Sequence, residues 1–333
     1  MSTARKYHTQ VTLTNGNVLV AGGTIDDITA MSSAEVHNPS TGRWAITGNM
    51  NTARFFHTAS ILANGNVLVA GGISGDGTAL SSVEVYNPST GLWTTTDTMN
   101  IARKYHTQVT LTNGNVLVAG GTSGDGITGL NMAEVFNPST GLWTTTGNMN
   151  TARFFHTACL LANGNVLVAG GTSGDGTALS SVEVYNPSTG LWTITGNMNS
   201  ARYFHTVSTL TNGNVLVAGG IAGGNNVLSS AEVYNPSTGL WITTSPMSTA
   251  RVLHTQVTLA NGNTLAAGGT VDLRTALSSA EVYNRSTGLW TTTATMSIAR
   301  FYHTASILAN GNVLIVGGGP DFISALNSAE VYG

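Results

Sequence analysis

The sequence predicts an all-β fold, a seven-bladed β-propeller of four-stranded antiparallel blades whose last blade lacks its outer strand within the chain. Two observations predict this fold: a unit of about 49 residues occurs seven times, and each unit contains four short strand-like segments separated by turns. No segment shows helical periodicity, and 41 of the 333 residues are glycine. Because the repeats fill residues 1–333, we expect one domain over that range.

Each repeat carries one arginine, one histidine and one glutamate at fixed spacing. The histidines are His8, His57, His106, His156, His205, His254 and His303. Three positions before them stand Arg5, Arg54, Arg103, Arg153, Arg202, Arg251 and Arg300. A diglycine follows in every repeat, and after it come Glu35, Glu84, Glu134, Glu183, Glu232, Glu281 and Glu330. In the third repeat Glu134 is displaced by one position, so the extra residue lies in the loop after the diglycine.

The second repeat illustrates the four predicted strands in order. His57–Leu62 is short and β-rich, and it ends at Asn64-Gly65, a strong hairpin signal. Val67–Ala70 is a continuous apolar run, as in a strand that is buried on both faces. A glycine-rich loop leads to Val83–Tyr86, and an Asn-Pro-Ser-Thr-Gly turn leads to Trp93–Thr96. Consecutive strands joined in this way form one antiparallel blade.

The last repeat is incomplete at its outer strand. Six tryptophans mark outer strands for seven repeats, and the chain stops at Gly333 before a seventh could follow. Met1 aligns with the methionines that come after the outer strands, such as Met50 and Met99, so the missing strand belongs before Met1 or after Gly333. We therefore expect the chain to be part of a longer or processed propeller. If it is not, the seventh blade has three strands and an open edge that can pair with another chain.

Composition excludes several classes of function. Charged residues make up 8% of the chain, the net charge is −3, and Lys6 and Lys104 are the two lysines, so no basic surface exists for nucleic acid. No apolar run reaches the length of a membrane span. A single cysteine, Cys159, excludes an internal disulfide framework. Few lysines and many threonines and asparagines favour an extracellular or cell-surface setting.

The motifs resemble those of the kelch-repeat β-propellers, in the branch that includes the galactose oxidase propeller. The resemblance covers the whole chain and rests on Arg-x-x-His, Val-Leu-Val-Ala-Gly-Gly, Ala/Val-Glu-Val-Tyr-Asn-Pro and Gly-x-Trp, in that order. It implies ligand binding at the face that carries the arginines, histidines and post-diglycine loops. In the related copper oxidases a Tyr-His pair binds copper, which Tyr7-His8, Tyr105-His106 and Tyr302-His303 match, and a tyrosine is crosslinked to cysteine. Those enzymes take a further histidine from another domain, and Cys159 replaces a serine of sibling repeats, so we predict no metal and no cofactor.

The arginine, histidine and glutamate set has two interpretations. In the structural one, each arginine pairs with a glutamate that fixes the blade loops, and the histidine makes a hydrogen bond beside the pair. In the functional one, a ring of cations and imidazoles faces the channel mouth and holds an anion or a metal. Seven equivalent histidines in a wide ring do not suit zinc or copper, which need three or four clustered ligands.

The loops after the diglycines vary most between repeats and lie on the predicted binding face. Residues just after the arginines, such as Phe55-Phe56 and Val252-Leu253, vary as well. Loops on a rigid scaffold commonly carry recognition, with surface drift as the alternative. The candidate binding residues are Asp26, Asp27, Asp76, Asp125, Asp175, Asn225, Asn226, Asp272, Arg274, Asp321 and Phe322.

These observations favour a non-catalytic binding or scaffold module that presents variable loops to a protein segment or a glycan. One alternative is the propeller part of a carbohydrate-acting or copper-radical oxidase. A second alternative is a structural repeat region of a larger surface protein.

Overall fold

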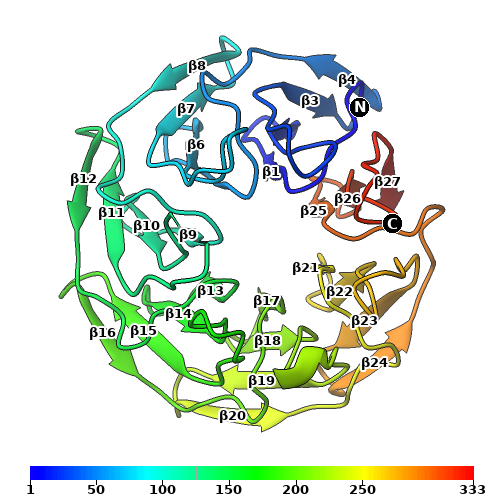
Figure 1. The fold of residues 1–333 in the computed structure, drawn as a ribbon. Helices are drawn as coiled ribbons and strands as arrows, with labels where there is room; N and C mark the ends of the chain where they lie inside the picture. Colours follow the sequence, from blue (N-terminus) through cyan, green and yellow to red (C-terminus); the bar gives the residue numbers. More distant parts are fainter. Residues whose placement is uncertain (125) are drawn as a thin grey trace.

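A computed structural model describes residues 1–124 and 126–333, and within them the chain forms seven antiparallel sheets arranged as a ring (Figure 1). Six of these described sheets have four strands and the seventh has three, which confirms the predicted seven-bladed propeller. The sheets follow one another around the ring in chain order, so each repeat forms one blade.

The strands of each blade run from the channel outward in sequence order. The innermost strands are β1 (Thr9–Thr12), β5 (Thr58–Ile61), β9 (Thr107–Thr110), β13 (Thr157–Leu160), β17 (Thr206–Thr209), β21 (Thr255–Thr258) and β25 (Thr304–Ile307). The second strands are β2 (Val18–Ala21), β6 (Val67–Ala70), β10 (Val116–Ala119), β14 (Val166–Ala169), β18 (Val215–Ala218), β22 (Thr264–Ala267) and β26 (Val313–Val316). All residues of the second strands are buried, because each blade packs between two neighbours.

The outer half of each blade completes the sheet. The third strands are β3 (Ala34–Asn38), β7 (Val83–Asn87), β11 (Ala133–Asn137), β15 (Val182–Asn186), β19 (Ala231–Asn235), β23 (Ala280–Asn284) and β27 (Ala329–Tyr332). The outermost strands are β4 (Arg43–Ile46), β8 (Leu92–Thr95), β12 (Leu142–Thr145), β16 (Leu191–Ile194), β20 (Leu240–Thr243) and β24 (Leu289–Thr292). The one helix in the described residues is a short 3-10 turn, η1 (Gly223–Asn225).

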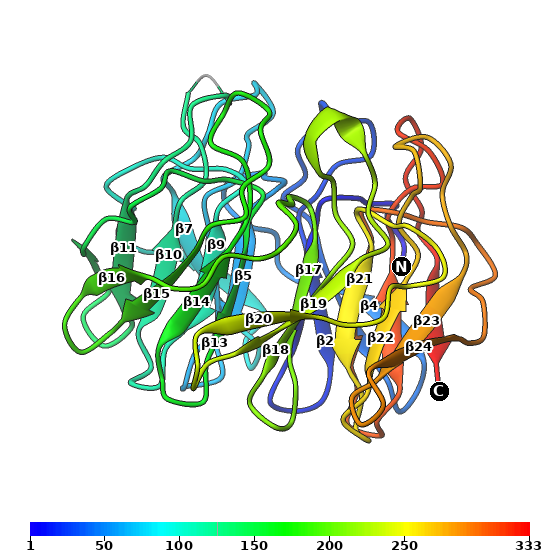
Figure 2. The same ribbon diagram turned by 90° about the horizontal axis from the view of Figure 1, so that it is seen from below.

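The connections sort onto two faces. The loops after the diglycines, including the loop that carries η1, extend from the upper side in Figure 2, and the Asn-Gly hairpins lie on the lower side. In the hairpin of the second blade, Gly65 has a φ of 81° and donates its N–H to the Leu62 carbonyl at 2.9 Å, so the turn requires a left-handed residue. The sequence predicted that the loops after the diglycines share one face.

The core consists of layers between blades. Between the second and third blades, Leu62 and Val83 pack with Met99, Phe136 and Trp143. Equivalent clusters lie between the other blades, and the cluster between the seventh and first blades takes in Met1 and Trp44. Each repeat therefore buries its apolar residues only by packing against its neighbours, as in other repeat proteins.

The seventh blade packs against the first with the same contacts that join the other adjacent blades. Gly318 donates its backbone N–H to the Arg5 carbonyl at 2.9 Å, the same bond that Gly23 makes to Arg54 at 2.9 Å between the first and second blades. The Gln10 amide also donates to the Ser306 hydroxyl at 2.6 Å. The junction between β25 and β1 is therefore built like the others.

Candidate functional site

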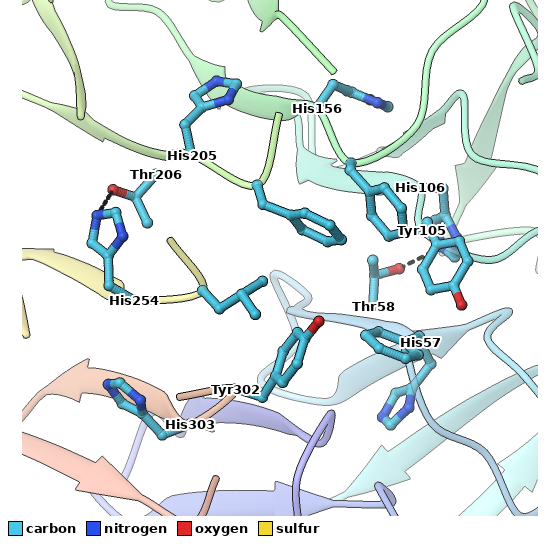
Figure 3. A pocket seen from close by; sticks show the side chains of 14 residues that line it. His57, Thr58, Tyr105, His106, His156, His205, Thr206, His254, Tyr302 and His303 are labelled. Carbon is cyan, nitrogen blue, oxygen red and sulfur yellow. Dashed lines mark hydrogen bonds between the residues drawn. The ribbon is translucent and has the colours of Figure 1, made fainter. Parts of the chain in front are cut away.

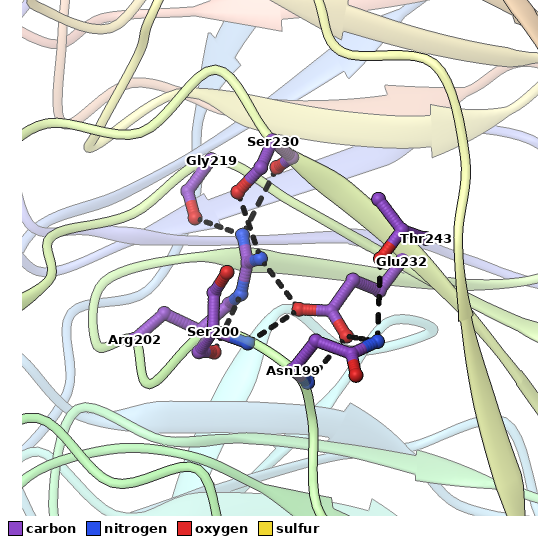
Figure 4. A network of polar contacts seen from close by, with 7 residues as sticks. All are labelled: Asn199, Ser200, Arg202, Gly219, Ser230, Glu232 and Thr243. Atoms are coloured by element: carbon purple, nitrogen blue, oxygen red, sulfur yellow. Dashed lines mark hydrogen bonds and ion pairs between the residues drawn. The ribbon is translucent and has the colours of Figure 1, made fainter.

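Each arginine of the repeat lies inside its blade, fully buried. In the fifth blade, Arg202 Nη1 donates to the carbonyls of Gly219 at 2.8 Å and Ser230 at 3.0 Å (Figure 4). Its Nη2 donates to the Ser230 hydroxyl at 3.0 Å and to Glu232 Oε1 at 2.9 Å. One guanidinium thus joins the diglycine, the approach to β19 and the glutamate on β19.

The glutamate fixes the segment that enters the blade. Glu232 accepts the backbone N–H of Asn199 on Oε2 at 2.7 Å and that of Ser200 on Oε1 at 3.0 Å. The Asn199 amide adds a third bond to Oε2 at 3.0 Å, as Figure 4 shows. The carboxylate is therefore surrounded by donors, which is what a buried charge requires.

The same ion pair recurs in every blade with nearly constant geometry. The Nη2–Oε1 distances lie between 2.6 and 3.1 Å, and each arginine side chain is 0% exposed. The pairs are Arg5–Glu35, Arg54–Glu84, Arg103–Glu134, Arg153–Glu183, Arg202–Glu232, Arg251–Glu281 and Arg300–Glu330. These seven pairs, together called the buried frame, have the geometry that the structural interpretation predicts. The guanidinium groups do not face the channel, so they offer no cationic ring to a ligand.

The histidines connect adjacent blades. His57 Nε2 lies 2.9 Å from the Thr9 hydroxyl of the preceding blade, and His8 Nε2 lies 2.7 Å from Thr304 across the junction of the last and first blades. The remaining pairs are His106–Thr58, His156–Thr107, His205–Thr157, His254–Thr206 and His303–Thr255. The structural interpretation placed this bond beside the ion pair. It instead bridges two blades, because the threonine on each inner strand faces the next imidazole.

Burial keeps these imidazoles neutral. Desolvation, followed by the charge of the nearby arginine, lowers the pKa of all seven histidines, and it lowers that of His106 and His303 to about 3. A neutral imidazole bonded to a hydroxyl provides little attraction for an anion. Across the described residues, no group of three or more His, Cys, Asp or Glu side chains is arranged to hold a metal ion.

Seven bulky residues surround the mouth of the central channel, one immediately before each histidine. They form what we call the axial collar: Tyr7, Phe56, Tyr105, Phe155, Phe204, Leu253 and Tyr302. Adjacent rings are in contact, with centroids 4.0 Å apart for Tyr7 and Phe56 and 3.9 Å apart for Phe155 and Phe204. Figure 3 shows Tyr105 and Tyr302 reaching into the space enclosed by the ring of histidines.

Every collar residue has a left-handed backbone. Their φ angles lie between 51° and 59°, a region that bulky side chains rarely adopt. Each such residue costs about 1–2 kcal/mol relative to an ordinary conformation. Backbone hydrogen bonds between neighbouring collar residues, such as Phe204 N–H to the Phe155 carbonyl at 3.1 Å, hold this arrangement. The strain turns each side chain toward the propeller axis instead of into its own blade.

The collar borders a cavity of about 310 Å³. Six collar side chains line it together with six of the buried histidines, and the threonines Thr58 and Thr206 lie at its wall. Burial raises the pKa of the Tyr105 and Tyr302 hydroxyls, so both stay protonated and can donate hydrogen bonds. The cavity is therefore apolar, uncharged and edged with neutral donors.

The aspartates predicted to bind a ligand mostly stabilise their own loops. Asp26 Oδ1 accepts the N–H groups of Ile28 at 3.0 Å and Thr29 at 2.7 Å. Asp76, Asp175, Asp272 and Asp321 accept equivalent bonds in their loops. The bonds from loop N–H and hydroxyl groups lower the pKa of Asp26, Asp76 and Asp272 to about 2. Asp125 lies outside the described residues.

The remaining predicted loop residues lie around the collar. Asp27 pairs with Lys6 at 3.0 Å, and Lys6 Nζ lies 5.5 Å from the centre of the Tyr7 ring and donates to the Phe322 carbonyl. The Phe322 ring packs 6.2 Å from that of Tyr302. Asn225 ends η1, Asn226 follows it, and the Arg274 side chain is exposed. The structure thus brings Asp27 and Phe322 to the collar, whereas Asp26, Asp76, Asp175, Asp272 and Asp321 bond within their own loops.

The residues that match copper oxidases have other contacts here. His8, His106 and His303 direct Nε2 to threonines, at 2.7 to 2.9 Å. Burial raises the pKa of the Cys159 thiol to about 12. Cys159 lies on β13, where it packs against the core cluster between the fourth and fifth blades. It is not part of the cavity lining.

The fold and this repeated frame define a seven-bladed propeller of Arg-x-x-His repeats. The KLHDC2/KLHL20/DRC7 Kelch-repeats domain matches the sequence over residues 7–193 and again over 106–319. The chain therefore belongs to the Kelch-repeat family. No curated protein matches it in sequence.

Among solved structures, the chain is similar to a novel fungal alcohol oxidase with catalytic diversity among the AA5 family, in complex with copper. The TM-score is 0.82 and the identity 18%, over 99% of this chain and 74% of the oxidase. At that identity the likeness establishes the fold and not the activity. In the part of the chain that the structure describes, no helix has the length and apolar character to cross a membrane.

Proposed function

We propose that this chain is a non-catalytic binding module, a scaffold that takes an uncharged protein segment at the axial collar and the loops around it. Kelch propellers typically bind proteins. The collar adds a specific location, because its side chains differ between repeats while all seven share an unfavourable backbone.

The observation that carries the proposal is the left-handed backbone of all seven collar residues. Strained residues persist where surrounding structure holds them, and they cluster at binding sites. Glycine would adopt this conformation without cost, yet tyrosine, phenylalanine and leucine stand there. Blade packing does not explain the strain, because the buried frame already provides that packing. A need for bulky side chains at the channel mouth explains it better.

The chemistry of the collar indicates the kind of segment. The arginines are buried and paired and the histidines are neutral, so nothing in the cavity selects for a negative charge. The cavity of about 310 Å³ is large enough for one apolar side chain of a bound segment. Tyr105 and Tyr302 supply hydroxyl donors for its backbone carbonyls.

Selection from a displayed random-peptide library against the full chain tests this proposal. We expect selected peptides to share an aromatic or aliphatic residue and to lack a requirement for charge. Phe204→Asn removes a collar ring at a backbone position that asparagine tolerates, and we expect it to weaken binding by about tenfold or more. Isothermal titration calorimetry of one selected peptide measures the change.

Ser188→Asp is the matched control, because Ser188 is exposed in the turn between β15 and β16 on the opposite face. It should leave the affinity unchanged. Peptides whose binding depends on Ser188 but not on Phe204 would contradict the proposal. The proposal would also be contradicted if the protein selects no peptide from the library but binds members of a glycan array.

A further inference from the structure

Lys6, the residue before Tyr7 of the axial collar, carries a charged side chain that is 0% exposed. At the equivalent position five of the seven repeats have an apolar or aromatic residue: Phe55, Phe154, Tyr203, Val252 and Phe301. Lys6 therefore places an ammonium group where most repeats place a packing residue. A buried charge is costly unless partners surround it, so the partners of Lys6 indicate what it does there.

The partners of Lys6 come from the loops of two neighbouring blades. Its Nζ pairs with Asp27 Oδ1 at 3.0 Å, in the loop after the first diglycine, and donates to the Phe322 carbonyl in the corresponding loop of the seventh blade. The same Nζ lies 5.5 Å from the centre of the Tyr7 ring, and that ring centre is 4.2 Å from the centre of the Tyr302 ring. The lysine thus holds the Asp27 carboxylate beside the collar.

Asp27 differs from the other loop aspartates that the structure describes. Five of them accept backbone N–H groups of their own loops: Asp26, Asp76, Asp175, Asp272 and Asp321. Asp27 makes no such bond with any described residue, its side chain is 38% exposed, and its φ of 68° is left-handed. Burial, and after it the charges of Tyr302 and Asp27, raise the pKa of the Tyr7 hydroxyl. A carboxylate has roughly four acceptor positions, so the contacts with Lys6 and Tyr7 leave some of them open to a ligand.

We propose that Asp27 is a specificity-determining residue of the collar, which accepts a hydrogen bond from an uncharged N–H or O–H group of the bound segment while Lys6 excludes a cationic one. This inference rests on the proposed function, because the segment in question is the one bound at the collar. A half-exposed carboxylate alone would attract lysine or arginine side chains. The Lys6 ammonium at 3.0 Å compensates that charge and repels a second cation, so only a neutral donor gains by binding there.

The place of Asp27 fits a donor that lies next to the anchor side chain of the segment. Tyr302 lines the cavity, and its ring contacts that of Tyr7. Tyr7 in turn contacts both members of the Lys6–Asp27 pair. A segment whose apolar side chain enters the cavity therefore has the residues beside that side chain near Asp27.

The charge selectivity of peptide binding tests this inference. In a peptide selected as described above, each residue beside the apolar anchor is replaced in turn by lysine and by glutamine, and isothermal titration calorimetry gives the ratio of the two affinities. In the unaltered protein, lysine should bind no better than glutamine at any position. Lys6→Met leaves the Asp27 charge uncompensated, so at one position the lysine peptide should gain about tenfold or more over the glutamine peptide. We expect this variant to fold, because most repeats have an apolar or aromatic residue at that position.

Two further substitutions in the Lys6→Met background locate the effect. Asp27→Asn should abolish the gain of the lysine peptide. Asp97→Asn is the matched control, because Asp97 is exposed just after the outer strand β8, and it should preserve the gain. The inference is overturned if the affinity ratios in the unaltered protein and in Lys6→Met are equal, or if the gain survives Asp27→Asn.

Phe204→Asn separates this inference from the proposed function. If it weakens all of these peptides while the ratios stay equal, the collar is the binding site and the role of Asp27 is wrong. If it weakens none of them, the proposed function is wrong, and the inference fails with it.

Discussion

The buried frame and the axial collar are next to each other in sequence yet have opposite properties. The frame has the same residue types in all seven repeats, and its charges are buried and paired. The collar, two positions after each arginine, varies among tyrosine, phenylalanine and leucine and has a strained backbone. The frame is uniform because every blade needs the same packing. The collar varies, and it forms a surface that exists only in the assembled ring. The two regions should therefore respond differently to perturbation.

Acid should have the largest effect, and it should act through the buried histidines that lie next to the frame. The pKa of every repeat histidine is lowered by burial, so the unfolded chain binds protons below pH 6.5 while the folded chain does not. Their stabilising contribution is complete above pH 6.5 and is lost as the pH falls toward about 3, the pKa of His106 and His303. Each histidine contributes about 1.4 kcal/mol per pH unit within that window.

Thermal unfolding followed by circular dichroism between pH 8 and pH 4 measures this effect. The melting temperature should be constant down to about pH 6.5 and then fall steeply. A melting temperature unchanged at pH 5 would show that the imidazoles can be charged in the folded ring.

Removing one arginine should be the next largest perturbation, and its size should depend on the blade. Arg202→Met leaves Glu232 buried without its partner, at a cost of about 3–5 kcal/mol in the free energy of unfolding. The loss in the free energy of unfolding for Arg300→Met should be smaller by at least about 1 kcal/mol, because water reaches Glu330 at the open edge. Urea titration compares the two variants, and equal losses would mean that edge exposure does not relieve the unpaired carboxylate.

The smallest effect on stability is expected in the collar. Phe204→Asn loses contact with the Phe155 ring but places at φ 53° a residue that tolerates this conformation. The two contributions oppose each other, so the free energy of unfolding should change by about 1 kcal/mol or less. If the same urea titration shows that Phe204→Asn lowers the free energy of unfolding as much as Arg202→Met does, the collar side chains serve packing and not binding.

The sequence predicted most of the fold because spacing is nearly constant between repeats. The predicted strands of the second repeat agree with β5 to β8 within one residue at each end, and the insertion near Glu134 lies between β10 and β11. The partnership of arginine and glutamate was also predictable, since a buried guanidinium requires an acid and each repeat offers one.

Less of the candidate site could be predicted from the sequence. Phenylalanine and tyrosine carry no signal for a left-handed backbone, so the variable pairs after the arginines indicated the place of the collar but not its geometry. An aspartate in a short polar loop, such as Asp26, looks the same in sequence whether it binds a ligand or caps the loop. The bond between His57 and Thr9 was not predicted, because its two residues belong to different repeats. The interval of 48 or 49 residues between each threonine and the histidine of the next repeat was the available signal.

The junction between β25 and β1 has a consequence for connectivity. His8 and Thr304, and Gly318 and Arg5, meet across that junction as their equivalents do elsewhere in the ring. The inner contacts thus do not depend on which blade comes first. A circularly permuted chain, joined between blades seven and one and opened at an Asn-Gly hairpin, would recover the same set of contacts between inner strands, so the order of the blades along the chain is a matter of genetic history more than of architecture.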